Sequence, residues 1–308
     1  MPMKKTVITL FGLLLSLGHL AAADFSVKEV KGEHVDIQYK GRNIARFMTA
    51  RDDSTPERTH DTYKTYLHVM DPLDEKGERY LTKGPGGKFT HHRGIYIGFS
   101  KMKVGEHAGD WWHCRKDERQ AYAGILKQEA TDESLKLVVA VNWVKGDILC
   151  VSEAREFIFH KPDDKGSFLI EKTSRLSAIA GDATLKGDPE HAGCQFRPSN
   201  DVVANKSAKY LAAGGAAVGS KGQKDLPWVA STFKFNDQDY LIQHLSDPKL
   251  PKGTIYSAYR DYGRFGVYWV DTIPKGQSKS YRFGFFISTG TLPEDEAELQ
   301  ARWEAFAK

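Results

Sequence analysis

The residue types best suited to chemistry occur close together in HAGCQFR, residues 191–197. If this segment is a strand, His191, Gln195 and Arg197 share one face, because side chains alternate along a strand. Gly193 leaves space between them, while the other face is apolar. Imidazole, amide and guanidinium groups together supply hydrogen-bond donors and acceptors, which suits a ligand rich in hydroxyls. A polar network satisfied within the protein is the alternative.

A second segment, THHRG at residues 90–94, supplies two adjacent histidines. Adjacent side chains of an extended segment point to opposite faces, so His91 and His92 are a poor chelating pair for a metal. The next strand is expected to begin at Ile95, which leaves the histidines and Arg93 in the loop that enters it. We expect this loop to form the rim of a binding site. One histidine would contact the ligand and the other would make a structural hydrogen bond.

Two further segments carry polar and aromatic side chains that could join the same site. In GDWWHC, residues 109–114, Trp112 precedes His113, and an exposed indole could stack on the apolar face of a sugar ring. Burial in the core is the alternative for this tryptophan. In YRDYGRFG, residues 259–266, polar side chains surround two glycines. This turn either stabilises itself or faces a ligand.

Other kinds of site lack their sequence signals. There is no GxSxG elbow, HExxH pair, P-loop or GxGxxG before a helix, so serine hydrolysis, zincin chemistry and nucleotide binding are not expected. The net charge is only +4 and no basic run stands out, which argues against nucleic acid as a partner. We expect neither a cofactor nor a metal.

β-strand patterns dominate the elements that must position these residues. Segments rich in β-branched and aromatic residues predict strands over 135–144, 148–160, 167–178, 231–245, 264–270 and 279–289. In YLHVMDP, residues 66–72, Tyr66 and His68 would share a strand face. A helix pattern at 293–308 begins with Pro293 and would cover a sheet edge. We therefore predict an all-β fold, a large antiparallel β-sandwich with a short C-terminal helix, in a single domain over 24–308.

The beginning of the chain has the pattern of a secretory signal peptide. Lys4 and Lys5 precede an apolar stretch too short to span a bilayer, and small residues up to Ala23 fit a cleavage site. We therefore expect residues 1–23 to be removed, giving a periplasmic or secreted protein with no membrane span. The cysteines are too few for a disulfide framework, and we expect buried free thiols at Cys114, Cys150 and Cys194. One disulfide with one free thiol is the alternative.

Taken together, these motifs resemble a family of exported bacterial proteins of unknown function known as PmoA-like, or methane oxygenase PmoA. The resemblance covers about residues 40–290, and its motifs are THHRG (90–94), WHC (112–114), GDPEHAGCQFR (187–197) and RDYGRFG (260–266). It implies a supersandwich fold similar to galactose mutarotase, found among carbohydrate-degrading proteins. A true methane monooxygenase subunit is an integral membrane protein. Because this chain shows no spanning segment after its signal peptide, the family name does not give its function.

The resemblance also implies roles for the matching residues. A mutarotase sets a carboxylate base against a histidine acid across the sugar, and an imidazole with a pKa of about 6.5 suits proton transfer near neutral pH. The predicted catalytic residues are His113, His191 and Asp261, with Asp188 and Glu190 as other candidate carboxylates. The predicted substrate-binding residues are His91, His92, Arg93, Trp112, Gln195, Arg197, Tyr262 and Arg264.

The sequence therefore predicts an exported carbohydrate-active protein. It would bind a sugar or sugar derivative in a concave sheet face and act on it by histidine general acid/base chemistry, as an epimerase, lyase or hydrolase. A non-catalytic glycan-binding module is one alternative. A metal-dependent oxygenase, as the family name suggests, is another, and it would need two or three of these histidines around one ion. The oligomeric state is left open.

Overall fold

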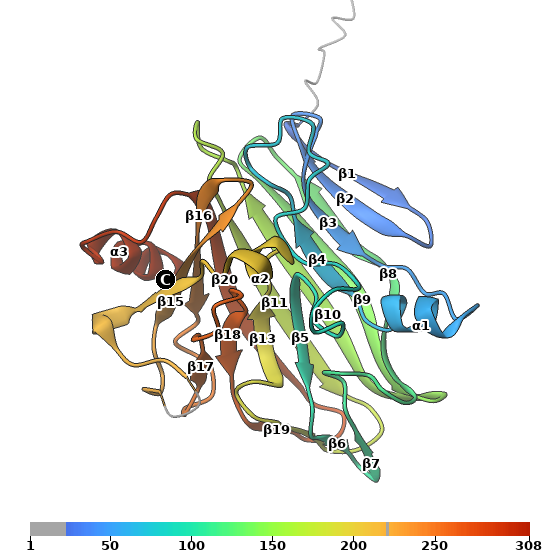
Figure 1. Ribbon diagram of the computed structural model, residues 1–308. Coiled ribbons are helices and arrows are strands. Elements are labelled where there is room, and N and C mark those ends of the chain that lie inside the picture. The colour runs from blue at the N-terminus through green and yellow to red at the C-terminus, as the bar shows by residue number, and fades with distance from the viewer. Residues whose placement is uncertain (1–22, 220–221) are drawn as a thin grey trace, which may run out of the picture.

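The computed structural model describes residues 23–219 and 222–308. The expected signal peptide lies outside the described residues, apart from its last residue, Ala23. Antiparallel strands form two eight-stranded sheets and one four-stranded sheet (Figure 1). The predicted fold class, an antiparallel β-sandwich with a short C-terminal helix, is confirmed.

Four of the segments with candidate site residues lie on or next to strands of the first sheet: 66–72, 90–94, 191–197 and 259–266. In spatial order its strands are β1 (Phe25–Val30), β2 (His34–Tyr39), β3 (Arg42–Met48), β4 (Tyr66–Val69), β5 (Ile95–Phe99), β13 (Ala192–Phe196), β18 (Phe265–Tyr268) and β17 (Ile255–Ser257). The predicted start of a strand at Ile95 is confirmed. Tyr66 and His68 do share a face, with ring centroids 5.0 Å apart.

The second sheet packs against the first, and smaller elements complete the fold. The strands of the second sheet are β14 (Lys209–Ala212), β15 (Trp228–Phe235), β16 (Gln238–Ser246), β20 (Ser278–Thr289), β11 (Phe168–Ala178), β10 (Ile148–His160), β9 (Ser134–Lys145) and β8 (Glu118–Ala130). The third sheet comprises β19 (Asp271–Ile273), β12 (Ala183–Leu185), β6 (Met102–Val104) and β7 (His107–Gly109). The helices are α1 (Pro56–Thr62), α2 (Asp201–Asn205), the short 3-10 turn η1 (Ala213–Gly215) and α3 (Ala297–Phe306). None of the helices in the described part of the chain is long and apolar enough to cross a membrane.

One apolar core lies between the two large sheets. Phe47 of β3 packs against Phe157 of β10 with ring centroids 5.7 Å apart. Alternate residues of β13 face this core, and Cys194 and Phe196 are fully buried there. Burying a large apolar side chain stabilises the fold by about 1.5–3 kcal/mol, so this alternation fixes which face of β13 is turned outward. The predicted apolar face of HAGCQFR is confirmed.

The segment 231–245 forms a hairpin, in which the turn residues of FNDQ (235–238) separate β15 from β16: Asn236 and Asp237 adopt positive φ angles of 47° and 59°. One predicted element, the C-terminal helix, differs from the structure. Helix α3 begins at Ala297 rather than at Pro293. It covers a sheet face, not an edge, because its Leu299 packs among apolar side chains of β15 and β16.

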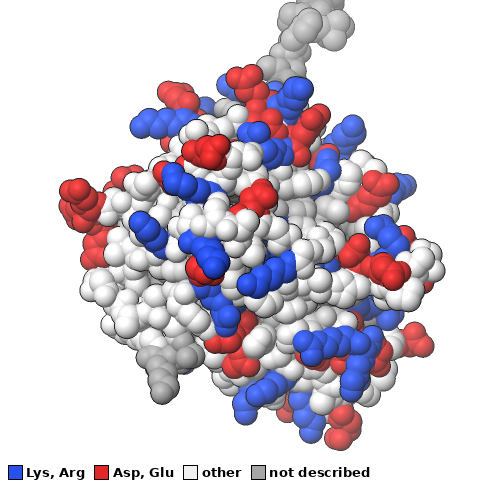
Figure 2. Space-filling view, in the orientation of Figure 1, with Lys and Arg blue, Asp and Glu red and all other residues white. Residues whose placement is uncertain are grey.

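The distribution of surface charges and the state of the cysteines both agree with the sequence. Figure 2 shows basic and acidic side chains interspersed over one face, in line with a small net charge. All three cysteines are buried free thiols, as expected. Burial raises the pKa of the Cys114 thiol to about 12. This thiol is therefore neutral near neutral pH.

Candidate functional site

The candidate site lies where loops cross the outer face of β5 and β13. These strands are antiparallel and pair Gly98 with Gly193, so His91 and His191 enter the face from opposite ends. A Cβ atom on Gly98 would lie 2.6 Å from a carbonyl oxygen of the following loop, so this glycine lets residues 110–114 lie directly on the strand. The three histidine-bearing loops consequently meet over the sheet.

Two of these loops carry the same short motif, GDWWH and GDPEH. Nδ1 of His113 lies 2.7 Å from a carboxylate oxygen of Asp110, and Nδ1 of His191 lies 2.9 Å from Asp188. Each aspartate also accepts hydrogen bonds from the backbone N–H groups two and three residues later. Because a carboxylate only accepts, each imidazole donates its Nδ1 proton and leaves Nε2 for a ligand or water.

The imidazole rings of three loops form one cluster. The ring centroid of His113 lies 5.2 Å from that of His191 and 4.5 Å from that of His91. The rings of His91 and His92 are 4.3 Å apart. The side chains of His91 and His92 do not point to opposite faces, as they would in an extended segment. This segment is instead a turn, in which the His92 N–H donates to the Phe89 carbonyl oxygen.

Burial keeps two of these histidines neutral. Burial, reinforced by the charge of Lys64, lowers the pKa of His91 to about 2. Burial, reinforced by the charge of Arg264, holds the pKa of His92 far below its usual value. Within residues 23–219 and 222–308, Nε2 of His91 is buried without a hydrogen-bond partner. A neutral imidazole nitrogen in this state is available to a polar ligand.

Lys64, which the sequence analysis did not single out, ties two of the loops together. Its Nζ donates to the His91 carbonyl oxygen at 3.1 Å and to the Trp112 carbonyl oxygen. The ammonium also lies over the rings of Tyr63 and Tyr96, 4.9 and 4.8 Å from their centres. Burial lowers the pKa of Lys64 to about 7. No local pattern marks this residue, since its partners are distant in the sequence.

The three predicted arginines are buried and hold the loops in place. Arg93 donates to backbone carbonyls of its own loop and of α1. Arg197 donates to the Tyr262 carbonyl oxygen at 2.9 Å and lies 4.8 Å from the centre of that ring. Arg264 donates to Oε1 of Gln195 at 3.1 Å. Each of these arginines is at most 1 % exposed, and their contact with a ligand stays a prediction.

The remaining predicted residues take different positions. Trp112 is fully buried against Tyr96, with ring centroids 4.8 Å apart, so in this arrangement it presents no face to a ligand. Asp261 is exposed, and its carboxylate makes no hydrogen bond or ion pair with any described residue. The carboxylates that contact the histidines are those of Asp110 and Asp188. The spacing of three residues shared by GDWWH and GDPEH is the sequence signal for them.

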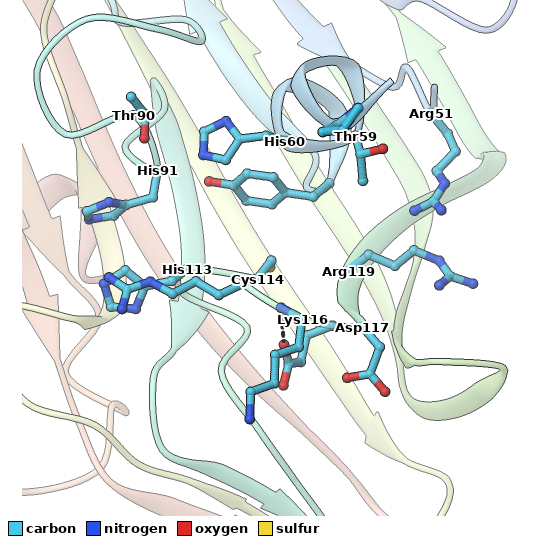
Figure 3. Close-up of a pocket in the computed structure, with 14 residues that line it drawn as sticks. Arg51, Thr59, His60, Thr90, His91, His113, Cys114, Lys116, Asp117 and Arg119 are labelled. Carbon is cyan, nitrogen blue, oxygen red and sulfur yellow. Dashed lines mark hydrogen bonds between the residues drawn. The ribbon is translucent and has the colours of Figure 1, made fainter. Parts of the chain in front are cut away.

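A pocket of about 470 Å³ opens beside these loops. Figure 3 shows His91 and His113 on one side of it and Arg51 and Arg119 on the other. His191 lies next to His113 but does not line this pocket. In the described part of the chain, no group of three or more His, Cys, Asp and Glu side chains is arranged to hold a metal ion.

Solved structures with similar chain paths share little sequence with this protein. The galactosidase domain of α-galactosidase–sucrose kinase AgaSK has a TM-score of 0.40 and 8% identity, over 87% of this chain and 40% of that one. A galactose mutarotase related enzyme from Lactobacillus acidophilus has a TM-score of 0.38 and 7% identity, over 88% and 99%. The heparan sulfate lyase HepC from Pedobacter heparinus has a TM-score of 0.36 and 12% identity, over 89% and 38%. With TM-scores below 0.5, these likenesses carry no argument about what this chain binds or does.

Comparison at the level of sequence gives a firmer result. No curated protein matches the chain. A family model matches residues 34–304, which include every histidine-bearing loop of the candidate site. The chain therefore belongs to DUF6807, a family of unknown function.

Proposed function

We propose that this protein binds a sugar or sugar derivative beside His113, and that His113 and His191 transfer protons to and from it. The observation that carries the proposal is the pair of Asp–His contacts, with 5.2 Å between the two imidazole centroids. A carboxylate behind an imidazole fixes its tautomer and orientation and stabilises the protonated ring. Two such groups within reach of one ligand can serve as general acid and general base.

The chemistry of the pocket supports a ligand with many hydroxyl groups. Its walls combine imidazoles, the Thr59 and Thr90 hydroxyls and the Tyr63 phenol, which donate or accept hydrogen bonds as needed. The neutral His91 adds a buried nitrogen without a partner in the described residues. Such a lining suits polar groups at several positions on one small molecule.

The test begins with the purified mature protein and a panel of neutral and acidic sugars. Thermal shift identifies ligands, and proton NMR of each stabilising sugar then detects epimerised, cleaved or eliminated product. We expect His113→Gln to lower turnover by about 100-fold or more while the protein remains folded. His160→Gln is the matched control, because His160 also contacts a carboxylate, that of Glu171 at 2.8 Å, but lies on β10.

Two results would change this assignment. If His113→Gln keeps full turnover, histidine acid/base chemistry at this position is refuted. If no sugar is converted and the substitution alters only affinity, the protein is a glycan-binding module rather than an enzyme.

Export is part of the same proposal. The signal peptide pattern at residues 1–23 supports a periplasmic or secreted location. N-terminal sequencing of the protein from its native cells should begin at Asp24, and a chain that begins at Met1 would contradict cleavage. The motif resemblance to PmoA-like proteins stays a prediction.

A further inference from the structure

The charge of the pocket points to an acidic ligand: we infer that it takes a sugar that carries a carboxylate, such as a uronic acid. The inference rests on the proposed function and narrows its substrate class. The preference for an acidic ligand depends on which charged side chains of the pocket wall already have a partner of opposite charge within the protein.

Three cations of the pocket wall have no partner. Within residues 23–219 and 222–308, the side chains of Arg115, Lys116 and Arg119 make no hydrogen bond or ion pair. A fourth cation, Arg51, is neutralised by Asp53, whose carboxylate lies 2.8 Å away. The wall therefore offers three unpaired positive charges to whatever enters.

The acidic residues of the same wall do not balance these charges. Asp117 and Glu118 both lie near Nζ of Lys145, at 3.5 and 3.2 Å. Lys145 belongs to β9 and does not line this pocket. Lys145 offsets one of these two negative charges, and the three unpaired cations exceed the other. The pocket therefore keeps a positive potential, which concentrates anions.

The arrangement of the two walls selects a sugar acid rather than a simple anion. Neutral His91 and the Asp110-bound His113 form the wall opposite Arg119 (Figure 3). Hydroxyl groups suit the histidine wall, while a carboxylate suits the guanidinium wall, where charge-assisted hydrogen bonds are strongest. A uronic acid carries both kinds of group on one ring.

Calorimetric titration tests the inference at fixed ionic strength. The probes are D-glucuronate and D-galacturonate, the matched neutral sugars D-glucose and D-galactose, and acetate as a plain carboxylate. We expect at least one uronate to bind about ten-fold more tightly than its neutral counterpart. The double variant Arg115→Gln/Arg119→Gln should reduce this preference to about two-fold or less. Arg175→Gln should keep it, because Arg175 is an exposed arginine of β11 with no side-chain partner among the described residues.

Two of the possible outcomes overturn this inference alone, and a third overturns the proposed function as well. Neutral sugars that bind as tightly as uronates would overturn the inference and leave the proposed function standing. Acetate that binds as tightly as a uronate would also overturn it, since the pocket would then hold only an anion. Failure of every sugar to bind would overturn both.

Discussion

The GDWWH and GDPEH loops have the same spacing and the same hydrogen bonds but differ in burial. In the first, the side chains of His113 and Asp110 are 11% and 30% exposed. In the second, those of His191 and Asp188 are 39% and 42% exposed. The GDWWH loop, here called the inner loop, lies directly on β5 over Gly98, whereas the GDPEH loop, the outer loop, is the more exposed of the two. One local motif therefore gives two dyads in different environments.

The difference in burial has electrostatic consequences. Burial raises the pKa of Asp110, but the hydrogen bonds from His113 outweigh it and leave that pKa below its usual value. Charged hydrogen bonds shielded from water are stronger than exposed ones, which water and salt screen. We therefore expect the inner dyad, Asp110 and His113, to hold its geometry more firmly than the outer dyad, Asp188 and His191.

The largest expected effect is on turnover, once a substrate is found. His113→Gln and His191→Gln should each lower kcat by about 100-fold or more. The kcat of the double variant should be close to that of the less active single variant. Non-additivity is expected because two groups that act in one proton-transfer sequence fail together. Steady-state kinetics of the three variants measures it. If His191→Gln keeps nearly full kcat, only the inner dyad takes part in the reaction.

The next effect is on stability. Asp110→Ala should lower the free energy of unfolding by about 2 kcal/mol and Asp188→Ala by about 1 kcal/mol, because each removes charged hydrogen bonds but the outer ones are more exposed. Urea denaturation with an unchanged m value measures both. Equal losses of unfolding free energy in the two variants would show that the difference in burial does not affect the strength of these hydrogen bonds.

Part of this comparison could be read from the sequence, and part could not. Strands such as β10 alternate core and solvent residues, so their pattern is visible locally. β8, ERQAYAGILKQEA, was missed because it is an edge strand rich in Ala, Gln and charged residues, and its pairing with β9 overrides weak strand propensity. The Asp–His contacts were readable from the GDxxH spacing. The contacts of Lys64 were not, because its partners lie 27 and 48 residues away.

Lys64, which donates to the Trp112 carbonyl oxygen of the inner loop, should make the free energy of unfolding depend on pH. The pKa of Lys64 is lowered by burial from 10.5 to about 7, so between these values the unfolded chain binds a proton that the folded chain does not. Stability therefore rises with pH through this window, by at most about 1.4 kcal/mol per pH unit from this group. Lys64→Met should flatten this rise in urea titrations across the window. A variant whose stability rises with pH as steeply as that of the wild type would show that Lys64 is charged in the folded protein.

The smallest effect is expected at the rim of the outer loop. Arg260 Nη2 lies 2.6 Å from Glu190, and both side chains are partly exposed, at 26% and 30%. The Tyr259 hydroxyl also donates to Glu190 and lowers the pKa of that carboxyl. Because this hydrogen bond remains and exposed ion pairs contribute little, Arg260→Gln should cost about 0.5 kcal/mol or less, and the loss should shrink in high salt. Denaturation at low and high salt measures this difference. A larger, salt-independent loss would mean that the outer loop is held as firmly as the inner one, and the division of roles between the two dyads would then have no structural basis.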